Sequence, residues 1–487
     1  MTATVSDFQA LRMAIARLPA DVSNDAIGSS VPKLEDIYAP ETHAAALDPT
    51  TPIVVGARGT GKSFWAGVLG DTELRTAAAI AYPRLGLTRV AVQFGYTGIE
   101  GLSGIGRDKL DQCLPADVGL SEAREFFWAT ILRALTNAPE KPAPGLPAFL
   151  SDARNLDTRE MKLSEADQKL GKSGETLLIV YDALDTVATS WPRRRLLTQA
   201  LLEVVWAMRA YRSIRLKLFL RPDQLEDDEL HFVELPKLRA GAVRLAWPGL
   251  DLYGLLFARL SLGEAQESFG RLLLSLRLAG GSRERILSRQ WSLGQDAAQQ
   301  QKLMTAMAGP FMADGEHGYR KGKTYDWPLK HLADVFEEVT PRSFLGLMIA
   351  AANYGTAPPR RVITPGGIQH GLRAASKTRV DQLHQDFPWI KGVLAPLAGL
   401  LLPQEELQVF KVWRQAGTLS AAIADAGREG YLPPVEPGRS STVRERDLYT
   451  ALERIGVMLR RKDARIDMPD LFRVAAKLLK KGGTAPL

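Results

Sequence analysis

Residues 51–63, TPIVVGARGTGKS, constrain the fold more than any other part of this sequence. The β-branched run at 53–55 is typical of a strand, and the GARGTGKS that follows matches the pattern G-x-x-x-x-G-K-[ST] at every fixed position. Gly56, Gly59 and Gly61 allow backbone turns with positive φ, which bring N–H groups close around a phosphate. The pattern therefore predicts a strand, a phosphate-binding loop and a helix.

The polar groups of this loop have expected partners on a nucleoside triphosphate. Lys62 would place a point charge against the β- and γ-phosphates, and Ser63 would offer its hydroxyl to Mg²⁺. The helix that begins there would direct its positive end at the phosphates. We therefore expect ATP and Mg²⁺ as ligands. The expected nucleotide-binding residues are Gly56, Ala57, Arg58, Gly59, Thr60, Gly61, Lys62, Ser63 and Phe64.

A second stretch, ETLLIVYDALD at 175–185, is expected to supply the metal side of the site. Its continuous apolar run predicts a strand buried on both faces. Because a phosphate loop needs a second acid at the end of a neighbouring strand, we expect this strand beside the loop strand. Asp182 falls at the carboxyl end of this strand, where ligands bind in open α/β sheets, and is expected to hold Mg²⁺ together with Ser63. Asp185 could orient the attacking water, or alternatively act as the N-cap of the following segment.

Three further stretches have the character of strands, at 89–94, 215–220 and 242–247. Strands that alternate with helical patterns predict a parallel sheet with helices on both faces, so the predicted fold class is α/β with a P-loop NTPase core. Arg221 follows one of these strands and is expected at the nucleotide edge of the sheet. There it would sense the γ-phosphate or act across a subunit interface, or else form a salt bridge with Asp223 or Glu226.

The order of these motifs resembles the bacterial AAA-related P-loop ATPases of the STAND and KAP kind. The resemblance rests on GARGTGKS, LLIVYDALD, LFLRPD and AVRLAW, and it covers about residues 30–350. The D-x-x-D of the second motif is close to the hhhhDxxD pattern of STAND proteins. TPRSFL at 340–345 is similar to the helical lid of such ATPases, and Arg342 would match the lid arginine that reaches the γ-phosphate.

This resemblance implies a switch ATPase that couples nucleotide state to assembly or to an effector, of the sort found in anti-phage defence. Many AAA-type ATPases carry glutamate directly after the strand aspartate, where this chain has Ala183, so fast hydrolysis is not expected. The leading hypothesis is a Mg-ATP-binding switch that hydrolyses ATP slowly or on activation by a partner, as a homo-oligomer or with an effector protein. A DNA-stimulated motor or loader and a non-hydrolysing, nucleotide-bound scaffold are the alternatives.

Four segments are expected along the chain. They are a helical entry segment at 1–50, the P-loop core at 51–261 with an insertion at about 137–174, a helical lid at 262–395 and a winged-helix-like domain at 396–487. In the last segment, RRKDARIDMP at 460–469 resembles a hairpin wing and 470–483 a final basic helix. Winged helices either contact DNA or serve as internal packing modules, and both alternatives stay open here.

Basic residues are concentrated in places, in a chain of 487 residues with a formal net charge of +7. Arg193, Arg194 and Arg195 are adjacent. The stretch 315–327 interleaves basic and aromatic residues, which would either grip nucleic acid or join the lid to the core. The basic C-terminal residues would form either a DNA contact or a solvated surface, and they are Arg460, Arg461, Lys462, Arg465, Arg473, Lys477, Lys480 and Lys481.

Other classes of protein find little support in the sequence. Cys113 is the only cysteine, which rules out an intramolecular disulfide and a thiolate zinc site. The apolar runs fall short of the roughly 20 residues that span a bilayer, and the N-terminus does not resemble a secretory signal. We expect a cytoplasmic protein without a membrane partner.

Overall fold

The computed structural model describes residues 3–19, 32–99, 104–136, 144–227, 229–356, 358–435 and 444–486. The chain forms two compact units. The sheet unit is Ser23–Leu245, and the helical unit combines Met1–Val22 with Ala246–Leu487. The expected division into four segments is finer than these two units and stays a prediction. Part of the expected insertion, at 137–143, lies outside the described residues.

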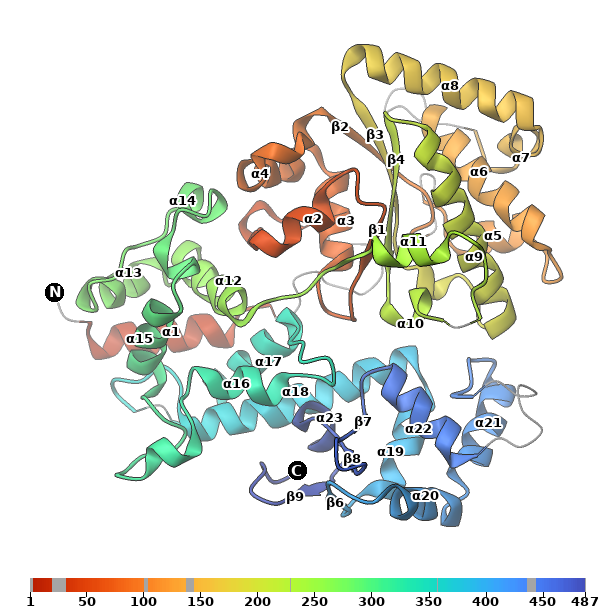
Figure 1. The fold of residues 1–487 in the computed structure, drawn as a ribbon. Coiled ribbons are helices and arrows are strands. Elements are labelled where there is room, and N and C mark those ends of the chain that lie inside the picture. The colour runs from red at the N-terminus through yellow and green to blue at the C-terminus, as the bar shows by residue number, and fades with distance from the viewer. Residues whose placement is uncertain are drawn as a thin grey trace. The chain divides into compact units, whose positions relative to one another are not determined.

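Five parallel strands form the sheet, in the order β2-β3-β4-β1-β5 (Figure 1). Their bounds are β1 Ile53–Val55, β2 Val90–Phe94, β3 Thr176–Tyr181, β4 Ile214–Leu220 and β5 Val243–Arg244. In register, Ile53 pairs with Leu218, and Ile179 pairs with Gln93 on one side and Leu216 on the other. The sheet confirms the expected α/β fold class. The Asp182 strand β3 was expected beside the loop strand β1. This was wrong, because β4 lies between them.

Helices cover both faces of this sheet (Figure 1). Alternate residues of β3 and β4, among them Ile179, Tyr181 and Leu218, join one buried apolar cluster with side chains of α6 and α9. The helices α3 and α4 lie on the other face. The helices of this unit are α2 Ala44–Leu47, α3 Lys62–Gly70, α4 Thr72–Ala81, α5 Arg107–Cys113, α6 Leu120–Thr136, α7 Pro147–Arg154, α8 Leu156–Ser173, α9 Trp191–Ala207, α10 Pro222–Leu225 and α11 Leu235–Ala240.

The helical unit is built around the close pair α17 and α18. Gly367 and Gly371, four residues apart on α18, meet the backbone of α17, and a Cβ at Gly371 would lie 2.3 Å from the carbonyl oxygen of Leu347. The N-terminal helix α1 contacts α13 and α17. The helices before residue 390 are α1 Val5–Ala16, α12 Gly249–Leu262, α13 Gln266–Ser275, α14 Arg283–Leu287, α15 Ala297–Ala308, α16 Asp326–Leu332, α17 Pro341–Asn353 and α18 Pro365–Asp386.

The C-terminal part contains the expected hairpin. Strands β7 (Leu459–Arg460) and β8 (Ile466–Asp467) pair antiparallel, while β6 (Leu401–Leu402) and β9 (Leu479–Lys480) pair parallel. The remaining helices are α19 Ile390–Leu394, α20 Glu406–Gln415, α21 Thr418–Glu429, α22 Glu445–Arg454 and α23 Asp470–Arg473. The winged-helix assignment stays a prediction.

The final helix expected over 470–483 was wrong in length, because α23 ends at Arg473. The side chain of Arg473 is fully buried and donates to the carbonyl oxygens of Leu478 and Thr484, at 2.8 Å each. Lys477 adopts a positive φ of 58°. The chain therefore turns back after α23 and enters β9 instead of continuing as a helix.

Candidate functional site

The predicted phosphate loop runs from the end of β1 to the start of α3, as expected. Gly59 and Gly61 have φ of 85° and 99°, a left-handed region in which only glycine is unstrained. Gly56 is needed for space, because a Cβ there would lie 2.5 Å from Oγ1 of Thr60. That hydroxyl donates to the carbonyl oxygen of Ala57 at 2.8 Å. The loop is therefore a compact turn in which each glycine has a physical reason.

The side chain of Lys62 folds back over this loop. Its Nζ donates to the carbonyl oxygens of Gly56 at 2.8 Å and Ala57 at 3.0 Å. The hydroxyl-bearing Ser63 is exposed, whereas the ring of Phe64 is buried and packs edge-on against Trp65. Phe64 can therefore reach a phosphate only through its main-chain N–H, which belongs to the first turn of α3.

Asp182 lies at the carboxyl end of β3 and is buried. Its main-chain N–H donates to the carbonyl oxygen of Tyr96 at 3.0 Å. Burial raises the pKa of the Asp182 carboxyl above its usual value, against a hydrogen bond from Ser63 and the charge of Lys62, which both lower it. The fold thus brings Lys62, Ser63 and Asp182 together, although β4 separates their strands.

The Ser63 hydroxyl and the Asp182 carboxylate are hard oxygen donors of the kind that Mg²⁺ takes in proteins. The described residues contain no group of three or more His, Cys, Asp and Glu side chains that could hold a metal ion. Mg²⁺ commonly binds through one or two protein groups with phosphates and water as its other ligands. The Ser63–Asp182 pair therefore fits a magnesium ion that arrives with a nucleotide.

Asp185 lies in the short 3-10 turn η5, Leu184–Thr186, directly after β3. The N-cap of η5 is Ala183, with a φ of 53°, and the N-cap of α9 is Ser190. The capping alternative for Asp185 is therefore wrong. Its carboxylate Oδ2 instead lies 3.3 Å from Nη1 of Arg221.

Arg221 extends from the end of β4 and is buried. Its Nε and Nη2 donate to the two carboxylate oxygens of Asp223, at 2.9 and 3.0 Å. Nη2 of Arg194, on α9, lies 2.9 Å from the same carboxylate. Although burial opposes it, these two guanidinium groups hold the pKa of Asp223 well below its usual range. The salt bridge expected as an alternative for Arg221 thus exists, as part of a buried network.

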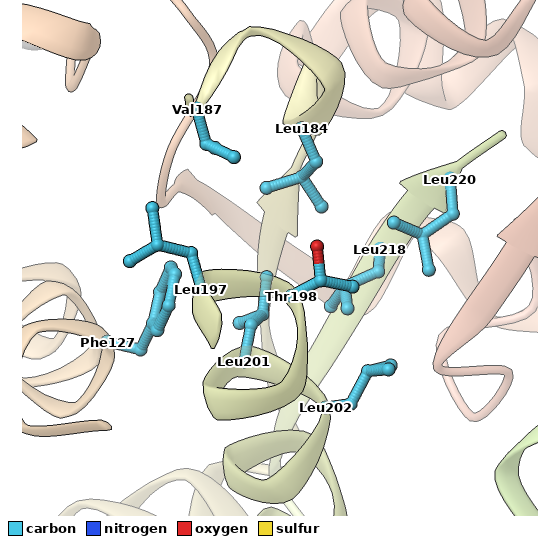
Figure 2. A pocket seen from close by; sticks show the side chains of 9 residues that line it. All are labelled: Phe127, Leu184, Val187, Leu197, Thr198, Leu201, Leu202, Leu218 and Leu220. Carbon is cyan, nitrogen blue, oxygen red and sulfur yellow. The ribbon is translucent and has the colours of Figure 1, made fainter. Parts of the chain in front are cut away.

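An apolar pocket lies beneath the turn that carries Asp185 (Figure 2). Leu184 and Val187 enter it from the turn, and Leu218 and Leu220 enter it from β4. The remaining lining residues are Phe127, Leu197, Thr198, Leu201 and Leu202. The turn is therefore anchored by apolar side chains, while Asp185 itself, 31% exposed, faces Arg221.

Arg194 and Asp223 were not predicted as site residues. The three consecutive arginines looked like a patch of charge, yet each has a different partner. Arg193 pairs with Asp111, Arg194 with Asp223 and Arg195 with Asp227. These pairings join residues 29 or more positions apart, so no local pattern could have revealed them.

Arg342 belongs to the helical unit. It is the second residue of α17, whose N-cap Thr340 accepts a hydrogen bond from the main chain of Ser343, and its side chain is buried. Its expected role toward a γ-phosphate stays a prediction.

The basic and aromatic stretch at 315–327 is packed within the helical unit in its second half. Tyr325 stacks on Tyr253 at a centroid distance of 4.3 Å, and Trp327 stacks on His331 at 4.1 Å. Tyr319 in the first half is exposed. Both rings therefore stack on other rings of the same unit, and that of Tyr325 is buried.

Many C-terminal basic residues are engaged in ion pairs. Arg460 and Arg446 both bind Glu406, and Lys480 binds Asp467 at 3.1 Å. Further pairs join Arg461 and Arg465 to Asp463, and Arg473 to Asp470. Much of the positive charge of this region is thus neutralised locally.

No protein-family model matches this chain, and no curated protein matches it. A Walker-type ATPase of Pyrococcus abyssi is 12% identical with a TM-score of 0.38, over 94% of this chain and 97% of its own. The ORC2 protein of Aeropyrum pernix, solved as ADPNP–ADP complexes, is 13% identical with a TM-score of 0.28, over 93% and 94%. Cdc6p of Pyrobaculum aerophilum is 12% identical with a TM-score of 0.26, over 92% and 93%.

With TM-scores this low, the three structures add nothing to what the loop and the sheet of this chain show. Among the described residues, no helix has both the length and the apolar character needed to cross a membrane.

Proposed function

We propose that this protein binds ATP with Mg²⁺ and works as a switch ATPase whose turnover is slow or depends on a partner. The observation that supports this most strongly is the joining of the phosphate loop to Asp182. The Ser63 hydroxyl and the charge of Lys62 both lower the pKa of the Asp182 carboxyl, so both groups lie close to it. A phosphate loop with a carboxylate at this place can hold both the phosphates and their metal ion.

In this proposal the loop amides and Lys62 hold the β- and γ-phosphates, and the start of α3 adds its positive end. Lys62 donates to two loop carbonyls, and in this proposal its ammonium group binds phosphate oxygens. Ser63 and Asp182 would hold Mg²⁺. When bound, the ion neutralises charge that develops on the phosphates during hydrolysis.

We propose slow turnover because few carboxylates among the described residues are placed to orient the water that attacks the γ-phosphate. Ala183 stands directly after Asp182, so no carboxylate occupies that position. Asp185 is the nearest acid in the turn, and it is paired with Arg221. A base that is already paired must be released before it can orient water, which favours a switch over a fast enzyme.

The wider role is inferred from the resemblance to STAND and KAP ATPases. We propose that the switch acts in the cytoplasm, within a bacterial complex of the kind used against phages, as a homo-oligomer or with an effector protein. Arg342 is proposed as the lid arginine. A DNA contact through the C-terminal region is less well supported, because many of its basic residues have acidic partners.

The experiment that tests the proposal is nucleotide binding and phosphate release by the full chain and its Lys62→Ala variant. Binding to a fluorescent ATP analogue should fall at least about 10-fold in the variant, because a charge-assisted contact to phosphate is lost. Lys172→Ala, which removes an exposed lysine on α8, serves as the matched control. Equal binding by Lys62→Ala and the wild type would overturn the site assignment.

Phosphate release measured with and without duplex and single-stranded DNA separates the alternatives. Release that is slow and unaffected by DNA supports the switch. Strong stimulation by DNA would favour a motor or loader, and tight binding with no release under any condition would favour a nucleotide-bound scaffold.

A further inference from the structure

Four charged side chains form a continuous network at the carboxyl edge of the sheet. Arg194 of α9 binds Asp223 of α10, Asp223 binds Arg221 at the end of β4, and Arg221 binds Asp185 in η5. Among the described residues, these four side chains carry two positive and two negative charges, so that each cation faces an anion.

The links of this network are unequal. The two carboxylate oxygens of Asp223 accept hydrogen bonds from Nε and Nη2 of Arg221, at 2.9 and 3.0 Å, and the Asp223 side chain is 10% exposed. Asp185 contacts only Nη1, at 3.3 Å, and is 31% exposed. A two-point pair between buried groups is held more firmly than a single longer contact at the surface. The contact between Arg221 and Asp185 is therefore the one that a ligand can displace.

The place of Arg221 in the sheet suggests which ligand this is. It follows β4, which lies between β1 with the phosphate loop and β3 with Asp182. The end of β4 that carries Arg221 thus lies between the two strands whose ends carry the groups proposed to hold the phosphates and the metal ion. A γ-phosphate is an anion that could replace the Asp185 carboxylate on Nη1, and ADP lacks this group.

We propose that Asp223 and Arg194 are positioning residues that hold Arg221 so that its Nη1 exchanges between Asp185 and the γ-phosphate. In the empty and ADP states Asp185 is tethered to Arg221. Binding of ATP breaks this tether and releases the carboxylate of Asp185 toward the attacking water. The inference rests on the proposed function and adds to it a device that distinguishes triphosphate from diphosphate.

The proposal predicts opposite effects for the two carboxylates that bind Arg221. Asp185→Asn removes a charged competitor for Arg221, so the protein should prefer a non-hydrolysable ATP analogue over ADP more strongly, by about 3- to 10-fold. Asp223→Asn removes the group that orients Arg221, so this preference should fall by about 10-fold. Asp223→Glu keeps the negative charge, so this variant should recover part of the preference for the ATP analogue.

The test measures dissociation constants for ADP and for the analogue AMP-PNP, both with Mg²⁺, in the full chain. The ratio of the two constants is the readout, because a general loss of structure would weaken both ligands alike. Asp227→Asn is the matched control. It breaks the ion pair between Asp227 and Arg195, at 3.0 Å. Arg195 follows Arg194 on α9 but binds Asp227 instead of Asp223. Its ratio should equal that of the wild type.

Asp185→Asn decides the question, since its side chain is partly exposed and its substitution is compatible with folding. A ratio that rises in this variant supports the exchange, and a ratio that is unchanged or lower overturns it. The proposed function fails separately, if Lys62→Ala binds nucleotide as well as the wild type does.

Discussion

The Nζ of Lys217 lies 2.8 Å from the carbonyl oxygen of Thr51, although Lys217 sits in the middle of β4 with no exposed surface. The same ammonium group donates to the carbonyl oxygens of Ala46 at 2.8 Å and Asp48 at 2.9 Å. Its three N–H groups thus bind the end of α2 and the turn that leads into β1. Through Lys217, the central strand β4 therefore holds residues 46–51, which precede β1 and the phosphate loop, in place.

The free energy of unfolding should depend on pH through Lys217. Burial lowers the pKa of Lys217 from 10.5 to about 7, against the charge of Asp48, which raises it. Between pH 7 and 10.5 the unfolded chain therefore holds the proton that the folded chain has lost, so stability from this group rises with pH across this window. Lys217→Met removes this dependence.

The measurement is urea unfolding of the wild type and Lys217→Met at pH 6.5 and 9.5. The wild type should gain about 3 kcal/mol relative to the variant between these pH values, at about 1.4 kcal/mol for each pKa unit crossed. Lys172→Met, at an exposed position on α8, should show the same difference from the wild type at both pH values. A constant difference for Lys217→Met as well would contradict a lowered pKa.

Gly56→Ala should impair the phosphate loop more than a single methyl group suggests. The new Cβ would lie 2.5 Å from Oγ1 of Thr60, which must then leave its hydrogen bond to Ala57. We expect ATP affinity to fall about 10-fold or more, measured by titration with a fluorescent analogue. Gly270→Ala is the control, since nothing lies within 4 Å of its added Cβ, and its affinity should be unchanged.

Gly371→Ala should destabilise the packing of α17 on α18. Its Cβ would meet the carbonyl oxygen of Leu347 at 2.3 Å, so the two helices must move apart. We expect a loss of about 2 kcal/mol in thermal or chemical unfolding, within the range for overpacked sites. Gly392→Ala, on α19 with open space around the added Cβ, should lose much less. Equal losses would show that the close approach of the helices is unimportant.

Local pattern was enough to predict the phosphate loop and the strand ending at Asp182. A glycine-rich turn between a β-branched run and a helix is specified by adjacent residues, and so is a buried strand with an acid at its end. The fold class follows from the alternation of such elements.

The order of strands and the partners of Arg221 needed the folded chain. The sequence around Leu177–Tyr181 and Ile214–Leu220 has no pattern that predicts the place of β4 beside β1. Arg194 reaches Asp223 only because α9 and α10 meet at one edge of the sheet. The early end of α23 has a similar cause, since the hydrogen bonds of the buried Arg473 favour a turn over a helical pattern.

Leu184→Ala should affect hydrolysis through the pocket beneath Asp185. Leu184 is buried and fills part of this pocket directly before Asp185 (Figure 2). Its truncation should cost about 3 kcal/mol of unfolding free energy and loosen the turn. Because a displaced Asp185 would hold the attacking water poorly, phosphate release should fall about 10-fold or more while ATP binding stays within about 3-fold.

Leu202→Ala is the matched control for this prediction. Leu202 lines the same pocket from α9, is fully buried and does not belong to the turn. Its truncation should reduce stability by a similar amount yet leave the rate of phosphate release near that of the wild type, at a temperature where both variants are folded. If both variants lost turnover equally, the effect would follow from the pocket as a whole, and the anchoring of Asp185 by Leu184 would not explain it.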